Sequence, residues 1–451
     1  MNGIYEIKRA WGDRAAFLGL FVLSLLIAYL ITASRSALLL SSPVELNYTG
    51  LSAAVPSGNG WHSDNRWKYH EDAFILSSIF APEPGRPAAV VRCQYLFAAR
   101  ETTPQTWFEE KASGVNGTIV RSGRMQKGAL VIDWAQVKKE GTPLNLFFGI
   151  SELPNNRRLN IEVHQVRGDA GLADKVFERI ADSLRFKDNG LLEAGSEIVA
   201  KVKSKGLAGF LDNQNQQVFF LIKTIGTRTE HVIGFTMDVL VDVGGGAKPN
   251  IQGAGLYYTR SPYGQEQVTS FRGDSRLDEF VWKSETYGPA GRSGSEIAID
   301  KGAAATVRKF DAQAEEKTYR LGSAAIPSIF LQQVLREMLD GDRKEIVVDV
   351  IRSDGTITPA FISRIEPEDI AEGEEAAYKL DLGLLCDGGF AELVYLDKQK
   401  QISRKALHVE GTLTFERAAL KDILEKFPER ADTILRSDKT PDPNALQETG
   451  Y

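Results

Sequence analysis

An uncharged apolar run near the N-terminus constrains this chain more than any other feature. Residues 15–34 read AAFLGLFVLSLLIAYLITAS and contain no charged side chain. A helix of about 20 residues spans roughly 30 Å, which is the thickness of the hydrocarbon core of a bilayer. Secretory signal peptides have a shorter apolar core, of about 7–15 residues. The run therefore predicts a transmembrane helix. A cleaved signal sequence is the alternative, because residues 32–34 are small.

The charges beside this run predict its orientation. Basic side chains up to Arg14 precede the run, whereas Arg35 alone follows it closely. Under the positive-inside rule, residues 1–14 lie in the cytoplasm, and the bulk of the chain lies outside, after a linker at residues 35–47. We therefore expect a single-pass membrane protein of a cell envelope, with its folded mass in the bacterial periplasm.

Composition limits what the remaining chain can be. With 451 residues, the chain exceeds what one hydrophobic core supports, so we expect two folded regions, at residues 48–187 and 196–430. The formal net charge of −6 argues against a nucleic-acid partner, since phosphate binding needs clustered Lys and Arg. Cys93 and Cys386 are far apart in the sequence and fit no metal or redox spacing, so they are expected to be free thiols.

Residues 48–187 show strands interrupted by two helices. The segment GLSAAVPSGNGW at residues 50–61 predicts a short strand and a Pro/Gly turn. Pro104 after Thr103 predicts the first turn of a helix, and four apolar runs between residues 118 and 166 follow as an antiparallel meander. LADKVFERIADSLRF at residues 172–186 has its apolar residues at helical spacing. That helix must pack on the sheet.

This order of elements, with its VP…GW opening and closing amphipathic helix, resembles the PsbP-like α/β/α sandwich. The resemblance is in the pattern of elements. Members of such folds mostly bind other proteins or membranes and are rarely enzymes, so the resemblance implies a binding region, and it assigns no site residue in this sequence.

A turn-rich linker at residues 188–195, within KDNGLLEAG, leads to a second region that is almost purely β. Its exception is IPSIFLQQVLREML at residues 326–339, a wide-striped amphipathic helix with Pro327 in its first turn. FERAALKDILEKFPER at residues 415–430 predicts a closing helix. Residues 431–451 are rich in Pro and Asp and predict a disordered tail.

The complete prediction is an α+β fold. It consists of one transmembrane helix, then an α/β/α antiparallel-sheet sandwich, then a curled antiparallel β-sheet, or half-barrel, with an internal helix. The last part rests on physical grounds, because a long twisted sheet curls and a lone helix commonly fills its hollow.

The segment GEEAAYKLDLGLLCDGGFAELVYLDKQKQISRKAL, at residues 373–407, resembles the LolA-like architecture of periplasmic lipoprotein carriers. The resemblance implies a concave, apolar face that receives acyl chains, and it assigns no ligand contact here. We expect that an apolar ligand cavity, if the curl encloses one, is lined by Met237, Leu256, Phe280, Trp282 and Met338. The alternative is that the same side chains form a filled core, because small barrels are usually packed solid.

No segment carries a catalytic or cofactor-binding pattern. The glycine-rich stretch at residues 242–250 lacks the GxxxxGK[ST] spacing of a phosphate loop, and Ser293 is not in a GxSxG motif. His164 is a single histidine in a strand-like run, which predicts a hydrogen-bonded sheet residue. We therefore expect no catalytic residue and no cofactor.

One histidine-containing segment offers candidate metal ligands. WHSDNRWKYHED contains two histidines and three carboxylates without a fixed geometry between them. A zinc site needs three or four converging ligands, so a solvated loop is the preferred interpretation and no metal is expected. The residues concerned are His62, Asp64, His70, Glu71 and Asp72.

These features favour a membrane-anchored envelope binding protein without catalytic activity, which binds lipid or another apolar ligand in its β-rich region. The alternative function is a structural or assembly subunit of a membrane complex that docks a protein partner through the PsbP-like region. A hydrolase with an unfamiliar arrangement of residues is a third hypothesis, which the scattered histidines disfavour. The expected partners are the membrane, a lipid or apolar ligand, and an envelope protein.

Overall fold

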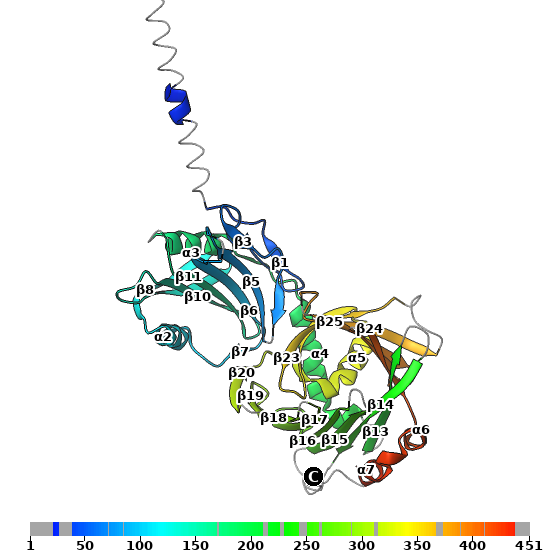
Figure 1. Cartoon of the computed structure of the whole chain (residues 1–451). Helices are drawn as coiled ribbons and strands as arrows, with labels where there is room; N and C mark the ends of the chain where they lie inside the picture. The colour runs from blue at the N-terminus through cyan, green and yellow to red at the C-terminus, as the bar shows by residue number, and fades with distance from the viewer. Residues whose placement is uncertain are drawn as a thin grey trace, which may run out of the picture.

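A computed structural model of the chain (Figure 1) describes most of its folded length. The described residues are 21–26, 38–70, 72–83, 85–168, 171–210, 215–225, 230–242, 250–260, 264–289, 291–310, 314–366, 373–387, 389–409 and 411–437.

The N-terminal part of the fold ends at Phe186 and is built mainly from strands. Its elements are β1 (Val44–Leu46), β2 (Leu51–Ala53), β3 (Trp61–Ser63), β4 (Lys68–His70), β5 (Ala73–Phe80), β6 (Ala89–Leu96), β7 (Ala99–Arg100), α2 (Pro104–Gly114), β8 (Thr118–Lys127), β9 (Leu130–Lys138), β10 (Asn145–Leu153), β11 (Arg157–Gln165), α3 (Leu172–Ser183) and β12 (Arg185–Phe186).

Most of these strands form one antiparallel sheet of eight strands in the order β3-β5-β6-β11-β10-β9-β8, with β4 paired to β5, and β1-β2-β12 form a small second sheet. Neighbouring residues of β10 point to opposite faces. Phe147 packs on Phe177 of α3, with ring centroids 5.2 Å apart. Phe148 lies on the other face, in the cluster that contains Phe108 of α2.

The C-terminal part contains the remaining elements. They are α4 (Leu191–Lys205), the 3-10 helix η1 (Leu207–Phe210), β13 (Asn215–Ile225), β14 (Glu230–Asp242), β15 (Asn250–Thr259), β16 (Glu266–Asp274), β17 (Phe280–Gly288), β18 (Gly291–Asp300), β19 (Ala304–Lys309), β20 (Glu315–Arg320), β21 (Ala325–Pro327), η2 (Ser328–Phe330), α5 (Leu331–Asp340), β22 (Glu345–Ile351), β23 (Ile357–Arg364), β24 (Glu374–Leu382), β25 (Phe390–Asp397), β26 (Ile402–Val409), β27 (Gly411–Arg417), α6 (Leu420–Lys426), η4 (Pro428–Arg430) and α7 (Ala431–Ser437).

A 16-stranded sheet dominates this part, and it runs from β21 through β27 and β13 to β20, with β7 of the N-terminal part at its end. In Figure 1 its two halves face each other with α4 and α5 between them. Phe330, at the start of α5, stacks edge-on against Phe271 and Phe280, at centroid distances of 5.9 and 5.7 Å. From the same helix, Gln332 donates to Gln401 beside β26, at 2.6 Å. The internal helix thus joins both halves of the curl.

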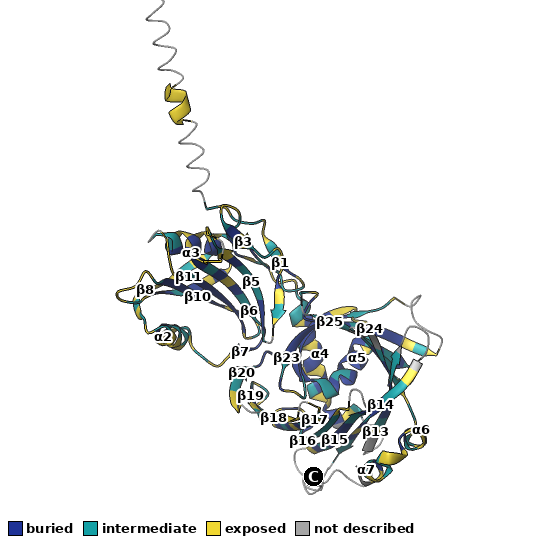
Figure 2. Ribbon diagram, in the orientation of Figure 1, coloured by how far each residue is buried: buried dark blue, intermediate teal, exposed yellow. Residues whose placement is uncertain are grey.

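Figure 2 shows α5 mostly buried, whereas α6 and α7 on the outside carry exposed residues. The sequence pattern predicts the internal helix correctly, but the helix begins later than predicted. Helix α5 begins at Leu331, and Pro327 lies in β21, which pairs in parallel with β22. Proline is tolerated there because β21 is at the edge of the sheet.

The predicted transmembrane helix is corrected. Among the described residues, no helix is both long and apolar enough to cross a bilayer. Of the predicted span, the structure describes residues 21–26, which are helical. The rest of the predicted span, residues 1–14 and residues 35–37 of the linker lie outside the described residues. The single-pass topology and the envelope localisation inferred from it are therefore not retained.

The predicted α+β class is also wrong, because strands predominate in both parts. Helices α2 and α3 have 11 and 12 residues. At 1.5 Å per residue each is less than about 20 Å long, whereas the path of seven strands from β3 to β8, spaced at about 4.8 Å, is about 30 Å wide. Neither helix makes a full layer over the sheet, so the fold is mostly β, without the predicted combination of transmembrane helix and α/β/α sandwich.

Helix boundaries in the C-terminal part also differ from the prediction. Helix α4 occupies most of the predicted linker, because it begins at Leu191. The predicted closing helix is divided among the end of β27, α6 and η4, and α7 occupies the first residues of the predicted tail. Residues 438–451 lie outside the described residues.

Candidate functional site

The two parts of the chain meet at a buried ion pair. Arg157 on β11 lies 2.8 Å from Asp349 on β22, and their side chains are 2% and 3% exposed. The guanidinium also lies 5.9 Å from the centre of the Tyr95 ring. Its Nε atom is buried and has no hydrogen-bond partner. Nearby, Tyr48 stacks on Phe361 with ring centroids 3.7 Å apart.

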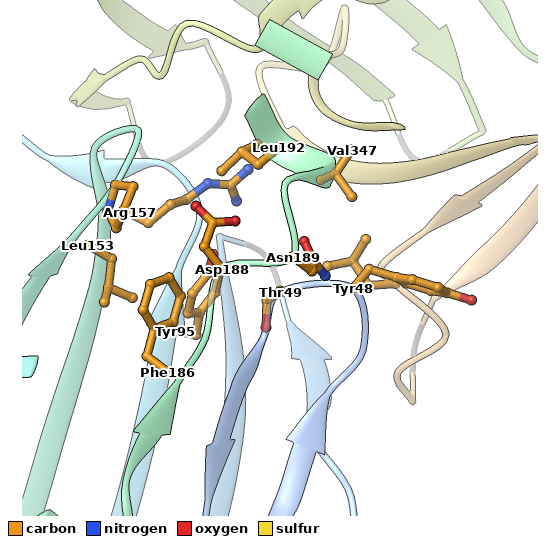
Figure 3. A pocket seen from close by; sticks show the side chains of 12 residues that line it. Tyr48, Thr49, Tyr95, Leu153, Arg157, Phe186, Asp188, Asn189, Leu192 and Val347 are labelled. Atoms are coloured by element: carbon orange, nitrogen blue, oxygen red, sulfur yellow. The ribbon is translucent and has the colours of Figure 1, made fainter. Parts of the chain in front are cut away.

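A small cavity lies at this junction, and Figure 3 shows its walls. Its volume is about 20 Å³. A single water molecule needs about 10–15 Å³ measured in this way, whereas small-molecule sites occupy roughly 300–1,000 Å³. The cavity therefore accommodates a water molecule near Arg157 and is too small for an organic ligand. Its lining comprises Tyr48, Thr49, Tyr95, Leu153, Pro154, Arg157, Phe186, Asp188, Asn189, Leu192, Val347 and Leu384.

The five residues expected around an apolar cavity lie in two separate clusters. Phe280, Trp282 and Met338 belong to the core inside the curl, with exposures of 1%, 2% and 0%. The Phe280 ring contacts those of Phe271 and Phe330 at 5.7 Å. These side chains pack against one another and fill the interior at this end of the sheet.

Met237 and Leu256 lie on the opposite face of the same sheet. They are paired directly across β14 and β15. Both belong to the cluster that also contains Ile423 and Phe427, where α6 covers the sheet from outside. The structure therefore does not bring the five residues together. The reason is the period of two along a strand, which sends Met237 outward and its neighbour Asp238 inward.

The inner face instead carries a polar row that the sequence analysis missed. The cross-strand register aligns one residue from each of β14 to β18 in this row. We call it the polar inner row. The alternation of FTMDVLVD, with Thr236 and Asp238 between apolar neighbours, is the signal that could have indicated it. Its members are Asp238, Gly255, Thr269, Ser284 and Ser295.

Asp238 is the one carboxylate of this row. Its side chain is exposed, yet desolvation raises the pKa of its carboxyl group above the usual value. The positive charge of Lys405 opposes this rise. Solvent thus reaches a carboxyl group that many protein atoms surround. Gly255 permits this position, because a Cβ there would lie 2.8 Å from Asp238 Oδ1 and 2.5 Å from Thr269 Oγ1.

Polar and aromatic groups surround the row. The Lys405 ammonium lies 5.7 Å from the Phe220 ring centre. Gln267 Nε2 donates to Ser284 Oγ at 2.9 Å and to Ser353 Oγ at 3.1 Å, so the turn between β22 and β23 reaches this end of the inner face. The next row along the strands is aromatic, because Phe271 and Trp282 are paired. The inner face therefore changes from polar to apolar within two residues.

A second cluster of charges lies under α2. Glu162 is 2% exposed and lies 2.6 Å from Lys111 Nζ, and His164 Nε2 is 3.4 Å from its other oxygen. Burial raises the pKa of the Glu162 carboxyl, but His164 and Lys111 together lower it to about 2. This cluster holds α2 on the sheet through an ionised carboxylate. His164 thus contacts a charged neighbour on its own strand.

The histidine-containing segment does not gather metal ligands. Within the part of the chain that the structure describes, no group of three or more His, Cys, Asp or Glu side chains is placed to hold a metal ion. Asp64 instead accepts a hydrogen bond from Ser77 Oγ at 2.6 Å and pairs with Lys68 at 2.7 Å. Glu71 and the glycine-rich residues 243–249 lie outside the described residues.

Comparison with known proteins assigns no family. No family model matches the sequence, and no curated protein matches it. Among solved structures, the chain is similar to a beta-barrel-like protein of domain of unknown function DUF1849 from Brucella abortus, with 8% sequence identity and a TM-score of 0.34. The match covers 45% of this chain and 94% of that one. A TM-score of this size supports no inference about fold or function.

Proposed function

We propose that this chain is a non-catalytic binding protein that holds a small amphipathic molecule on the inner face of its curled sheet. The observation that carries the proposal is the position of Asp238, which is exposed to solvent although it points to the inside of the curl. Solvent that reaches this carboxylate has to enter the curl, and a small ligand can enter by the same route.

The chemistry of the inner face favours an amphipathic ligand. Asp238 and Thr269 present a carboxyl and a hydroxyl group, and the aromatic pair Phe271 and Trp282 lies in the next row. A head group that carries an amine or a hydroxyl can donate to Asp238, while the apolar portion of the ligand lies toward Phe271, the partly exposed member of the aromatic pair. From the LolA-like resemblance, the proposal keeps only the concave binding face.

No chemical step is part of this proposal. The charged group that acts on Asp238 is Lys405. Binding requires only that a ligand contact Asp238 and the inner face, so the proposal assigns no nucleophile and no general base.

Competition between two amphiphiles tests the function. The full chain is titrated with the fluorescent probe 1-anilinonaphthalene-8-sulfonate, which is then displaced by dodecylamine or dodecanoate. We expect dodecylamine to displace the probe more strongly than dodecanoate. Asp238→Asn should lower the affinity for dodecylamine by about tenfold, which corresponds to about 1.4 kcal/mol for one charge-assisted contact.

Glu425→Gln is the matched control, because Glu425 is an exposed carboxylate of α6 on the outside of the sheet. It should leave both amphiphiles unaffected. Absence of displacement by either amphiphile, or equal weakening by the two variants, would contradict the proposal.

A second candidate function is docking of a protein partner through the N-terminal part. One observation favours it: Ile79 and Val166 are 41% and 42% exposed. Ile79 is paired with Val90 on β6. The test is chemical cross-linking in cell extract, in which a partner captured by the wild type should be lost with Ile79→Glu. Capture of the same proteins by both forms would count against docking at this face.

A further inference from the structure

A groove separate from the inner face lies between the C-terminal end of α4 and the turn that joins β16 to β17. It has a volume of about 300 Å³ and is lined by Lys203, Ser204, Arg276 and Asp278. This volume is at the lower end of the roughly 300–1,000 Å³ typical of small-molecule sites. The groove is therefore large enough for a compact ligand of a few heavy atoms.

Backbone contacts fix the walls of the groove. The buried Asp274 carboxylate accepts hydrogen bonds from the backbone N–H groups of Arg276 at 2.7 Å, Asp278 at 3.3 Å and Glu279 at 2.6 Å. The end of α4 is tied to the same turn, because the Leu207 N–H donates to the Ser275 carbonyl at 2.8 Å. The side chains that line the groove therefore extend from preorganised backbone.

The charges in the groove are not paired with each other. Among the described residues, the side chains of Lys203, Arg276 and Asp278 form no ion pair within 4.0 Å, whereas the nearby Lys205 pairs with Glu337. Lys203 is half-buried, and desolvation lowers the pKa of its ammonium group. The negative charges of Asp278 and Asp274 oppose this shift. A partly desolvated charge without a close partner is unfavourable, and a bound counter-charge would offset that cost.

Gly302, in the turn between β18 and β19, marks the space between the opposite charges. A Cβ at this position would lie 3.3 Å from Asp278 Oδ1 and 3.6 Å from Lys203 Nζ. Its φ of +62° is one that other residues rarely adopt. The Asp278 carboxylate and the Lys203 ammonium thus both lie near a point that no side chain occupies. They do not form an ion pair with each other.

We propose that this groove binds a compact zwitterion, with its oxyanion on Lys203 and Arg276 and its primary amine on Asp278. Arginine presents several N–H donors in a fork that suits a phosphate or carboxylate, and lysine adds a point charge. A carboxylate only accepts hydrogen bonds, so Asp278 suits an ammonium. A simple anion would leave the Asp278 carboxylate unpaired and would place a second negative charge close to it.

Isothermal titration calorimetry on the full chain compares three probes: O-phosphoethanolamine, inorganic phosphate and ethanolamine. The zwitterion should bind at least about tenfold more tightly than phosphate, because it gains the contact with Asp278, and ethanolamine should give no measurable binding. Asp278→Asn should reduce the affinity for O-phosphoethanolamine to that for phosphate. Lys203→Met should abolish binding of both.

Lys201→Met is the matched control, because Lys201 is exposed on the same helix and does not line the groove. It should leave all three titrations unchanged, and circular dichroism should show the same fold for every variant. Equal affinities for phosphate and O-phosphoethanolamine, no binding of the zwitterion at millimolar concentration, or the same loss in Lys201→Met would each overturn the proposal.

Discussion

Arg157 and Asp349 are 192 residues apart in the sequence and form a 2.8 Å ion pair that is almost fully buried between the two parts of the chain. Desolvation raises the pKa of the Asp349 carboxyl, and Arg157 opposes that rise. The pair therefore depends on both members: each charge is tolerated in the interior because the other is present. Loss of one member should destabilise the junction.

Removal of the Asp349 carboxylate should destabilise the protein. Asp349→Ala leaves Arg157 charged, buried and without its ion-pair partner, and the free energy of unfolding should fall by about 3–5 kcal/mol. Replacement of both residues, by Arg157→Met and Asp349→Leu, should restore much of this loss, because no charge is then buried. Urea unfolding followed by circular dichroism measures both values. A double variant less stable than Asp349→Ala would show that the ion pair is not the cause.

Acid should weaken the attachment of α2. The folded-state pKa of Glu162 is about 2, against an ordinary value of 4.5. Because it is depressed, its contribution to stability is present above about pH 4.5 and is lost as the pH falls toward 2. At 1.36 kcal/mol per pKa unit, the full loss is about 3 kcal/mol.

The measurement is urea unfolding at pH 5 and pH 3 for the wild type and Glu162→Gln. The wild type should lose more stability than the variant between these two pH values, because the variant lacks the titrating carboxylate. Identical losses would mean that Glu162 is not stabilised as an anion in the folded protein.

The approach of α4 to β22 should tolerate only glycine at position 195. A Cβ on Gly195 would lie 1.9 Å from the Val347 carbonyl oxygen. Gly195→Ala should therefore destabilise the protein by about 1–3 kcal/mol, as overpacked sites do. Gly114 is the control, since a Cβ there meets no atom within 4 Å. Gly114→Ala should be neutral or stabilising by up to about 1 kcal/mol. Thermal unfolding of both variants checks this contrast.

Local patterns predicted several elements correctly. Thr103 caps α2 by accepting a hydrogen bond from the Thr106 N–H at 3.2 Å, and Pro104 occupies the first turn, as expected. The stripe of apolar residues also identified α5 as a helix within the C-terminal sheet. These features depend on residues three or four positions apart, so one sequence is sufficient to reveal them.

Features that depend on contacts between distant parts of the chain could not be predicted from the sequence. Helix α4 contains Gly195, which reads as a turn signal until its contact with Val347 is known. Met237 and Met338 are both apolar and buried, but their faces depend on strand register and on α6 covering the sheet from outside. The groove at Lys203 is formed by segments more than seventy residues apart, so no local motif indicates it.

Photo-crosslinking tests the central claim most directly. The full chain is labelled with an alkylamine that carries a diazirine, with and without excess dodecylamine, and the modified peptides are mapped by mass spectrometry. The proposal predicts competed labels on β14, β15 and β16, around Asp238 and Thr269, and their loss in Asp238→Asn. Labels confined to the outer face under α6, or labels that dodecylamine does not compete, would contradict a binding site inside the curl.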